Sequence, residues 1–358
     1  MELLPQIEEK EAEQCHVCGV SPALGYNFGA LSCDACKMFF RRYVVQNKDY
    51  SCNPNLCTRK NERGIVRCKR CRFNMCLKAN MDPTVLEPSK FQHLEKTRSE
   101  QLTKMLADLM LRDGDRQIKL MTFYSTDDQS VENILKNEAV VRKMPMKPGY
   151  VVTADEWAFL ALYSTVTFYM KFKVVINLDT RDKNIVFKHV TLPLTYFAGL
   201  MRTKNGKEME MMSPGGNRIY PDKLLDDYGR DNQLLRLLCA EPVFRLHEMN
   251  VTNEEFCLMN MLILCNPAIP GLSEAAQKTL ATWSVYYFES LMYYCRSTHA
   301  NTFAGRAEEL RSLGNAVVAN AAKLENVFFL FHMKNKQYKF NQLVNQTFHI
   351  DESAEKVP

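Results

Sequence analysis

The sequence predicts a small, α-rich domain held together by metal ions, followed by an all-α domain with a small β-hairpin. Eight of the chain's cysteines fall within its first fifth, and basic residues gather around them. From residue 98 onward, helix-capping residues and apolar stripes with helical period run for about 250 residues, enough for a second hydrophobic core.

The spacing of the eight cysteines is typical of zinc ligands. Three pairs have two intervening residues, and a fourth pair has four. Cysteines at this spacing can close two tetrahedral four-sulfur sites, the geometry that Zn²⁺ prefers. The alternative is a disulfide framework. No apolar run long enough for a signal peptide precedes Asp49, which argues against it.

Positive charge is concentrated in the same region. Between Lys37 and Lys78 there are twelve Lys and Arg residues and two acids, so this segment carries +10 in a chain whose total is +5. A generally solvated basic face would not place its charge around metal ligands. The pattern therefore predicts a polyanionic partner, with nucleic acid the natural candidate.

The segment 33–44 is predicted to form a helix that begins at the second cysteine pair. Its apolar residues recur at helical spacing and can bury one face: Phe39, Phe40, Tyr43 and Val44. The charged residues then lie off that face: Asp34, Lys37, Arg41 and Arg42. Such a helix fits the DNA major groove, where cations reach guanine and a carboxylate accepts from cytosine.

A second basic segment begins at Arg67 and is expected to start another helix. Phe73 and Leu77 can pack beneath the first helix. Its cations, among them Arg67, Arg70 and Arg72, are expected to contact phosphates, which position a protein without reading sequence.

These motifs resemble the DNA-binding domain of nuclear hormone receptors over about residues 13–82. The run CKMFFRR and the closing segment from Cys71 to Met81 carry the resemblance, which is strongest to the receptors that have expanded in nematodes. It implies that Asp34 and Lys37 help select a hexamer half-site, and that Arg41 and Arg42 contact the groove and phosphates. It also implies two zinc ions per chain, one held by Cys15, Cys18, Cys33 and Cys36, the other by Cys52, Cys57, Cys68 and Cys71.

Three positions depart from the family pattern. Asp34 stands where several relatives carry the longer Glu, and Asn27 where many carry a phosphate-contacting His. The loop 53–56 is one residue shorter than usual, and relatives dimerise on DNA through it. Binding as a monomer and binding as a different dimer are therefore both open.

Domain boundaries follow from composition. We expect a flexible tail over 1–12, the zinc domain over 13–82, a hinge over 83–97, a helical domain over 98–345 and a C-terminal tail over 346–358. Turn and breaker residues predict the hinge. No window of eighteen apolar residues occurs, so no membrane span is expected.

Helix boundaries in the second domain are predicted from local signals. An apolar stripe that begins at Leu102 is expected to end near Gly114. Helices are expected to begin after Thr153, Thr252 and Ser273, the first two with capping boxes.

Strand signals are sparse. The only convincing one covers residues 208–220, where the segment 213–216 can turn a hairpin.

The helical part resembles a receptor ligand-binding domain, which implies a lipophilic ligand and transcriptional coregulators. The lysine with which relatives hold a coactivator aligns with Met170, and Lys171 is its neighbour. At the C-terminus there is no activation-helix motif; the segment Phe348–Asp351 is a poor substitute. Constitutive activity and repression are thus as open as ligand gating.

A long helix from Phe303 to about Met333 carries an apolar seam with a seven-residue repeat. We expect a homo- or heterodimer interface along Leu313, Val317, Asn320 and Leu324. The alternative is an ordinary core helix, since further apolar residues widen this face.

The sequence thus predicts a nuclear, zinc-dependent transcription factor that binds duplex DNA, with ligand regulation as one of the open modes of control. Two alternatives stay open: a zinc-dependent module for RNA or protein, and a small-molecule sensor with a vestigial DNA module. The absence of a P-loop, a dinucleotide-binding turn and a serine elbow predicts that it is not an enzyme.

Overall fold

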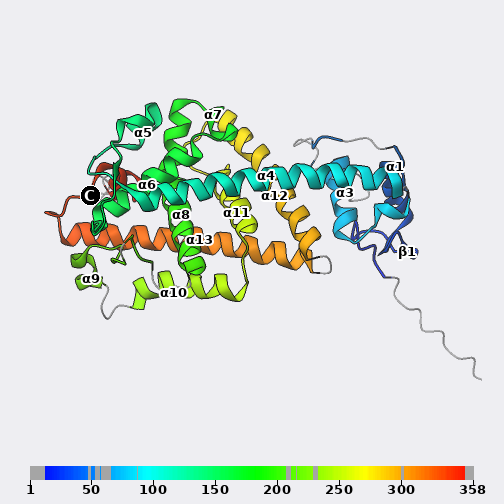
Figure 1. Ribbon diagram of the computed structural model, residues 1–358. Coiled ribbons are helices and arrows are strands. Elements are labelled where there is room, and N and C mark those ends of the chain that lie inside the picture. The colour runs from blue at the N-terminus through cyan, green and yellow to red at the C-terminus, as the bar shows by residue number, and fades with distance from the viewer. Residues whose placement is uncertain are drawn as a thin grey trace, which may run out of the picture. The chain divides into compact units, whose positions relative to one another are not determined.

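The chain folds into two compact units, Met1–Thr103 and Lys104–Pro358. The structure is a computed structural model (Figure 1). It describes residues 13–46, 50–52, 57, 66–86, 88–206, 211–214, 216–228, 233–299 and 302–350.

The first unit consists of short elements. In chain order these are β1 (Tyr26–Asn27), β2 (Ala30–Leu31), α1 (Asp34–Gln46), α3 (Lys69–Lys78) and the 3₁₀ helix η1 (Pro83–Val85). The strands pair antiparallel, with Tyr26 opposite Leu31.

One hydrophobic core joins α1 to α3. Phe40 is fully buried, and its ring centroid lies 5.6 Å from that of Phe73. The ring of Tyr43 stacks on Phe73 at 3.9 Å. Phe73 therefore packs beneath the first helix, as predicted, and Cys76 is buried in the same core.

Among its described residues, the second unit is mainly helical and contains one short sheet. Its elements are α4 (Pro88–Thr122, which begins in the first unit), β3 (Phe123–Tyr124), α5 (Val131–Lys136), η2 (Glu138–Val140), β4 (Met144–Pro145), α6 (Ala154–Tyr169), α7 (Lys173–Ile176), α8 (Thr180–Gly206), α9 (Asp222–Tyr228), α10 (Gln233–Glu248), α11 (Asn253–Leu264), α12 (Glu274–Thr298), α13 (Phe303–Lys334) and α14 (Gln342–Thr347).

Helix α4 differs from expectation at both ends. It begins at Pro88, inside the predicted hinge, where proline suits the first position because no N–H is needed there. It also continues past Gly114, the predicted end. Arg116 forms an ion pair with Asp113 across that glycine at 2.6 Å, and Leu120 packs with Trp157. These contacts outweigh the weak helix propensity of glycine.

The capping residues set the helix starts as predicted. Thr153 Oγ1 accepts from the Glu156 N–H at 3.2 Å, and Glu156 Oε2 accepts from the Thr153 N–H at 2.9 Å. Thr252 and Glu255 form the second capping box, and Ser273 caps α12. The long helix predicted from Phe303 is α13.

Helix α8 runs through the middle of this unit (Figure 1) and contacts α6, α10, α11 and α13. Val186, Phe187, Phe197 and Leu200 on it are fully buried. The hydrophobic core of the unit is therefore built around α8.

The predicted hairpin is reduced to a turn. Gly216 donates its N–H to the Ser213 carbonyl at 3.1 Å, and Met212 and Arg218 form a single bridge. Residues 207–210 lie outside the described residues. The sheet of this unit pairs β3 with β4, two residues each, which give too short a signal to be found in the sequence.

The C-terminal segment packs on the helices. Phe348 and Ile350 are buried, and the ring of Phe348 lies 4.5 Å from that of Phe328. The packed domain thus extends to Ile350, beyond the expected boundary at residue 345. Among the described helices none is both long and apolar enough to cross a membrane.

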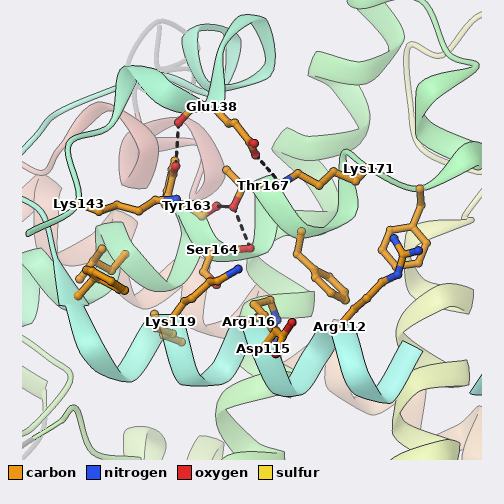
Figure 2. A pocket seen from close by; sticks show the side chains of 15 residues that line it. Arg112, Asp115, Arg116, Lys119, Glu138, Lys143, Tyr163, Ser164, Thr167 and Lys171 are labelled. Atoms are coloured by element: carbon orange, nitrogen blue, oxygen red, sulfur yellow. Dashed lines mark hydrogen bonds and ion pairs between the residues drawn. The ribbon is translucent and has the colours of Figure 1, made fainter. Parts of the chain in front are cut away.

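The hollows of the second unit include a groove, an interior cavity and a third hollow of about 650 Å³ lined by α4, α8 and α11. A groove of about 500 Å³ separates α4 from α6 (Figure 2). A smaller interior cavity of about 90 Å³ has Trp157, Tyr196 and Phe328 in its wall.

Candidate zinc centres and nucleic-acid interface

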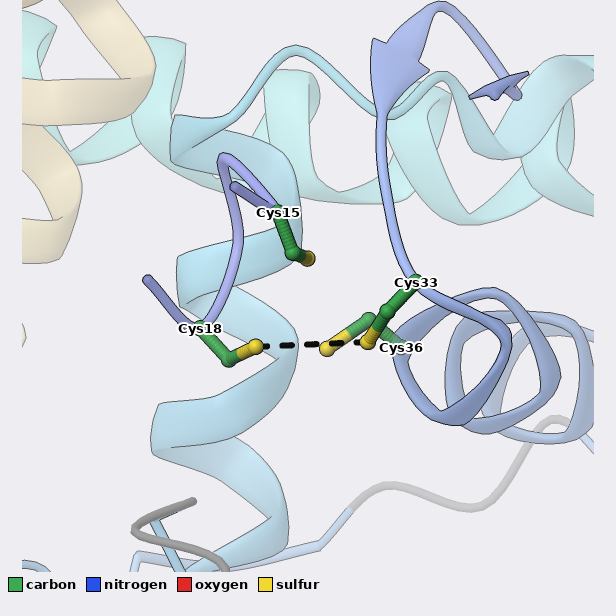
Figure 3. A group of neighbouring side chains, drawn as sticks. All are labelled: Cys15, Cys18, Cys33 and Cys36. Carbon is green, nitrogen blue, oxygen red and sulfur yellow. Dashed lines mark hydrogen bonds between the residues drawn. The ribbon is translucent and has the colours of Figure 1, made fainter. Parts of the chain in front are cut away.

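The first four-cysteine cluster links a turn to the start of α1 (Figure 3). Cys15 and Cys18 lie on the turn, which is closed by the Gly19 N–H donating to the Cys15 carbonyl at 2.8 Å. Cys33 and Cys36 lie at the N-terminus of α1. The four sulfur atoms lie within 4.8 Å of one another, with Cys18 and Cys33 at 3.9 Å.

The second cluster is assembled around the start of α3. Cys68 is its N-cap residue and Cys71 lies in its first turn. Their sulfur atoms, with those of Cys52 and Cys57, again lie within 4.8 Å of one another. Individual separations include 3.7 Å for Cys52–Cys71 and 3.5 Å for Cys57–Cys71.

These clusters fit two Zn²⁺ ions. Four sulfurs at 2.3 Å around a tetrahedral zinc lie about 3.8 Å apart, close to most of the separations found here. A disulfide needs about 2.05 Å, and all thirteen cysteines are free. The predicted zinc ligands are therefore brought together in the predicted sets.

The pKa values of the clustered cysteine thiols also bear on metal binding. Burial raises the pKa of the Cys36 thiol, and the neighbouring cysteines add to the rise despite a bond from Arg72. Burial likewise raises the pKa of Cys71. The pKa of Cys15, by contrast, is lowered to about 7, because its burial is outweighed by backbone hydrogen bonds. Zinc binds cysteine as the thiolate, so a bound ion would compensate the charge of each cluster.

The charged residues of α1 lie opposite its buried face. Asp34, Lys37 and Arg41 are spaced three and four residues apart, so they share one stripe, while Phe40 and Tyr43 point into the core. Asp34 and Arg41 are exposed and Lys37 is half-buried. The stripe thus presents one carboxylate and two cations to solvent.

Arg42 is exposed beside this stripe. Its Nε donates to the Met38 carbonyl at 3.2 Å, which leaves the rest of the guanidinium on the surface.

The three predicted phosphate contacts near α3 differ from one another. Arg67 is exposed just before the helix, and Arg70 is half-buried. Arg72 instead turns into the unit: its Nη2 donates to the Ala35 carbonyl at 2.9 Å, and its guanidinium lies 4.3 Å from the Phe39 ring centre. Its position joins α3 to the start of α1, a long-range contact that charge patterning does not reveal.

Asn27 also turns inward. Its Nδ2 donates to the Gly25 carbonyl at 3.0 Å and to Ser32 Oγ at 3.2 Å. In this position it stabilises the β1–β2 turn instead of presenting a donor for phosphate.

One close approach was not foreseen from the sequence. Gly29 has φ +95°, and a Cβ on it would lie 2.9 Å from the Asn80 carbonyl oxygen. Phe28 accepts from the Asp82 N–H at 2.6 Å beside it. The β1–β2 turn thus packs directly against the chain that follows α3, and only glycine fits at position 29.

Several basic residues counted in the sequence lie outside the described residues, as does the shortened loop 53–56: Lys48, Arg59, Lys60 and Arg63.

The predicted seam on α13 is mostly internal. Leu313, Val317 and Leu324 are buried within the second unit, as the core-helix alternative predicts. Asn320 is half-buried, and its Oδ1 accepts from Lys323 Nζ at 3.2 Å. A dimer through this helix stays a prediction.

Lys171, the neighbour of the coactivator-binding position, forms an ion pair with Glu138 on η2 at 2.7 Å. The Lys171 ammonium group, which could otherwise replace the family's lysine that is missing at position 170, is therefore already paired with Glu138.

Two family models match the chain. One describes a double treble clef zinc finger of the C4 type and matches residues 13–83, and the other describes the ligand-binding domain of nuclear hormone receptors and matches residues 143–334. The chain is 32% identical over 340 residues to the nuclear hormone receptor family member nhr-51 of Caenorhabditis elegans, an alignment that covers 94% of this chain and 90% of the relative. It is 28% identical to family member nhr-52 of the same nematode, over 93% of this chain and 98% of the relative.

Proposed function

Because this chain belongs to the nuclear hormone receptor family, we propose that it acts in the nucleus as a zinc-dependent transcription factor that reads a hexamer half-site in duplex DNA. The single observation that carries this proposal is the stripe of Asp34, Lys37 and Arg41 on α1, opposite the face that packs on α3.

Helix α1 is the reading element of the proposal. The major groove admits an α-helix, and a stripe with one carboxylate and two cations can contact both a cytosine amino group and guanine acceptors. Asp34 is a methylene shorter than glutamate, so the start of α1 has to approach the bases closely. A zinc ion held by Cys33 and Cys36, which flank Asp34 closely, would fix that end of the helix.

Phosphate contacts come from exposed cations outside the stripe. Arg42 and Arg67 both have exposed side chains. Such contacts set register and supply most of the salt-dependent affinity. Arg72 is not among them in this proposal, because its guanidinium is held by Ala35 and Phe39.

The test is a selection from random duplex DNA with the full, zinc-loaded chain. We expect one enriched hexamer, and fluorescence anisotropy should then give a log–log salt slope near −5 if about six phosphates are contacted. Enrichment of no sequence, or tighter binding to an RNA duplex than to the selected DNA, would refute sequence-specific DNA reading.

Ligand regulation is the second part of the proposal. The interior cavity lies between α6, α8 and α13 and carries Arg202 over the Trp157 ring at 5.0 Å. Its volume of about 90 Å³ is below the range of about 300–1,000 Å³ for small-molecule sites. A lipophilic ligand would therefore have to displace side chains, and coregulators would recognise the rearranged surface.

A further inference from the structure

The groove between α4 and α6 is distinct from the interior cavity. Its volume of about 500 Å³ lies within the range of about 300–1,000 Å³ for small-molecule sites. Arg116 and Leu120 line both hollows and so stand between them.

The groove is rich in cations, and three of them already have acidic partners. Arg112 pairs with Asp108 at 2.9 Å, Arg116 with Asp113 at 2.6 Å, and Lys171 with Glu138 at 2.7 Å. These pairs fix the walls without filling the space between them.

Two further cations have no such partner. Within the described part of the chain, neither Lys119 on α4 nor Lys143 forms an ion pair. Lys143 Nζ lies 5.2 Å from the centre of the Tyr163 ring. Its side chain is exposed, yet partial desolvation lowers its pKa, and Lys171 and Lys119 lower it further while Glu138 opposes them. Repulsion among these ammonium groups would be relieved by an anion in the groove.

The wall supplied by α6 is amphipathic. Phe168 on α6 meets Phe172, the N-cap residue of α7, edge to face at 5.3 Å, and Leu160 also lines the groove. Ser164 and Thr167 also line the groove (Figure 2), and Thr167 Oγ1 donates to the Tyr163 carbonyl at 3.0 Å. A ligand with an apolar body and an anionic head could therefore place its body against the aromatic rings and its head near the lysines.

We propose that this groove binds a small amphipathic anion, with its carboxylate or phosphate between Lys119 and Lys143 and its apolar body against Phe168 and Leu160. A carboxylate ligand and a phosphate ligand would share one feature, a compact anionic head on an apolar chain. Asp115 also lines the groove and opposes the anion. The inference does not depend on DNA binding by the first unit.

The test is calorimetric titration of the full, zinc-loaded chain with dodecanoate, dodecyl phosphate and dodecanol. Both anions should bind with one-to-one stoichiometry, and dodecanol about tenfold or more weakly. The tighter of the two anions identifies the head group. If dodecanol binds as tightly as the anions, or if neither anion saturates, the proposal is wrong.

Matched variants locate the bound anion. Lys119→Met and Lys143→Met should each weaken dodecanoate about tenfold, because each removes a charged hydrogen bond. Asp115→Asn should bind at least as tightly as the natural chain. Lys278→Met, an exposed change on α12, is the control and should leave affinity unchanged.

Circular dichroism establishes that each variant is folded. Unchanged dodecanoate affinity in a folded Lys119→Met/Lys143→Met double variant would place the ligand elsewhere and overturn the proposal.

Discussion

Arg306 and Glu255 form a buried, two-pronged ion pair that joins α13 to α11. Arg306 Nε and Nη2 donate to the two carboxylate oxygens at 2.7 and 2.6 Å, and Nη1 donates to the Met249 carbonyl at 2.8 Å. Glu255 Oε2 also accepts from the Thr252 N–H at 3.0 Å as part of the capping box. One carboxylate therefore fixes both the start of α11 and the position of α13.

Arg306→Met should lower the free energy of unfolding of the second unit by about 3–5 kcal/mol, because it leaves the Glu255 charge buried without its partner. Urea denaturation followed by circular dichroism measures the loss. The control is Arg311→Met, which breaks an exposed pair with Glu308 and should cost far less, because solvent screens exposed charges. Equal losses in the two variants would contradict the assignment.

Glu325 on α13 should make stability depend on pH. Burial raises the pKa of its carboxyl from 4.5 to about 7, so the folded state binds the proton more tightly than the unfolded state. Its stabilising effect is therefore full below pH about 4.5 and is lost as the pH rises to about 7. Glu325→Gln should exceed the natural chain in stability by about 1–3 kcal/mol at pH about 8 and match it at pH about 4.5. Denaturation at both pH values checks this, and a constant difference would refute it.

Lys37→Ala should relax the preference for one base pair of the selected site at a cost of about 1–3 kcal/mol. Arg67→Ala, by contrast, should weaken all sequences alike and reduce the salt slope by about one, because a phosphate contact carries no base information. Anisotropy titrations on matched and mismatched duplexes separate the two effects. If Arg67→Ala instead lost the base preference, Arg67 would be the base-reading residue and the assignment of the two roles would be wrong.

Zinc removal should unfold the first unit and leave the second largely helical. Structural zinc contributes about 10–16 kcal/mol of folding free energy per site. Titration with a chelator, followed by limited proteolysis, should release fragments from residues 13–82 before any cut in α6 or α8. Elemental analysis should find two zincs per chain, and a smaller number would contradict the two-cluster assignment.

Arg72→Ala should destabilise the first unit by about 1–3 kcal/mol, because the Ala35 carbonyl loses its donor. The chelator concentration at half-unfolding should fall accordingly. Arg67→Ala is the matched control, since that side chain is exposed. A variant that stays fully stable yet binds DNA weakly would restore the phosphate-contact interpretation.

Local signals in the sequence predicted much of this fold. Thr153, Thr252 and Ser273 begin their helices because a side-chain oxygen there satisfies a backbone N–H that has no partner within the helix. The cysteine spacing predicted both zinc clusters, because few spacings of four cysteines allow tetrahedral coordination of one ion.

What the sequence did not reveal depends on distant partners. The continuation of α4 past Gly114 follows from packing of Leu120 on Trp157, residues far apart in the chain. The spacing of Leu313 and Val317 is the same whether a helix packs against its own domain or a second subunit. The inward turn of Arg72 likewise depends on α1, because a basic run does not distinguish a phosphate contact from an internal one.

Among the described residues, one core built on Phe40, Tyr43 and Phe73 joins the two helices that carry the four-cysteine clusters. A chain with only one zinc ion would lack part of the core against which the other cluster packs. Folding of the first unit should therefore respond to zinc supply as a threshold: copies that hold one ion would behave like copies that hold none.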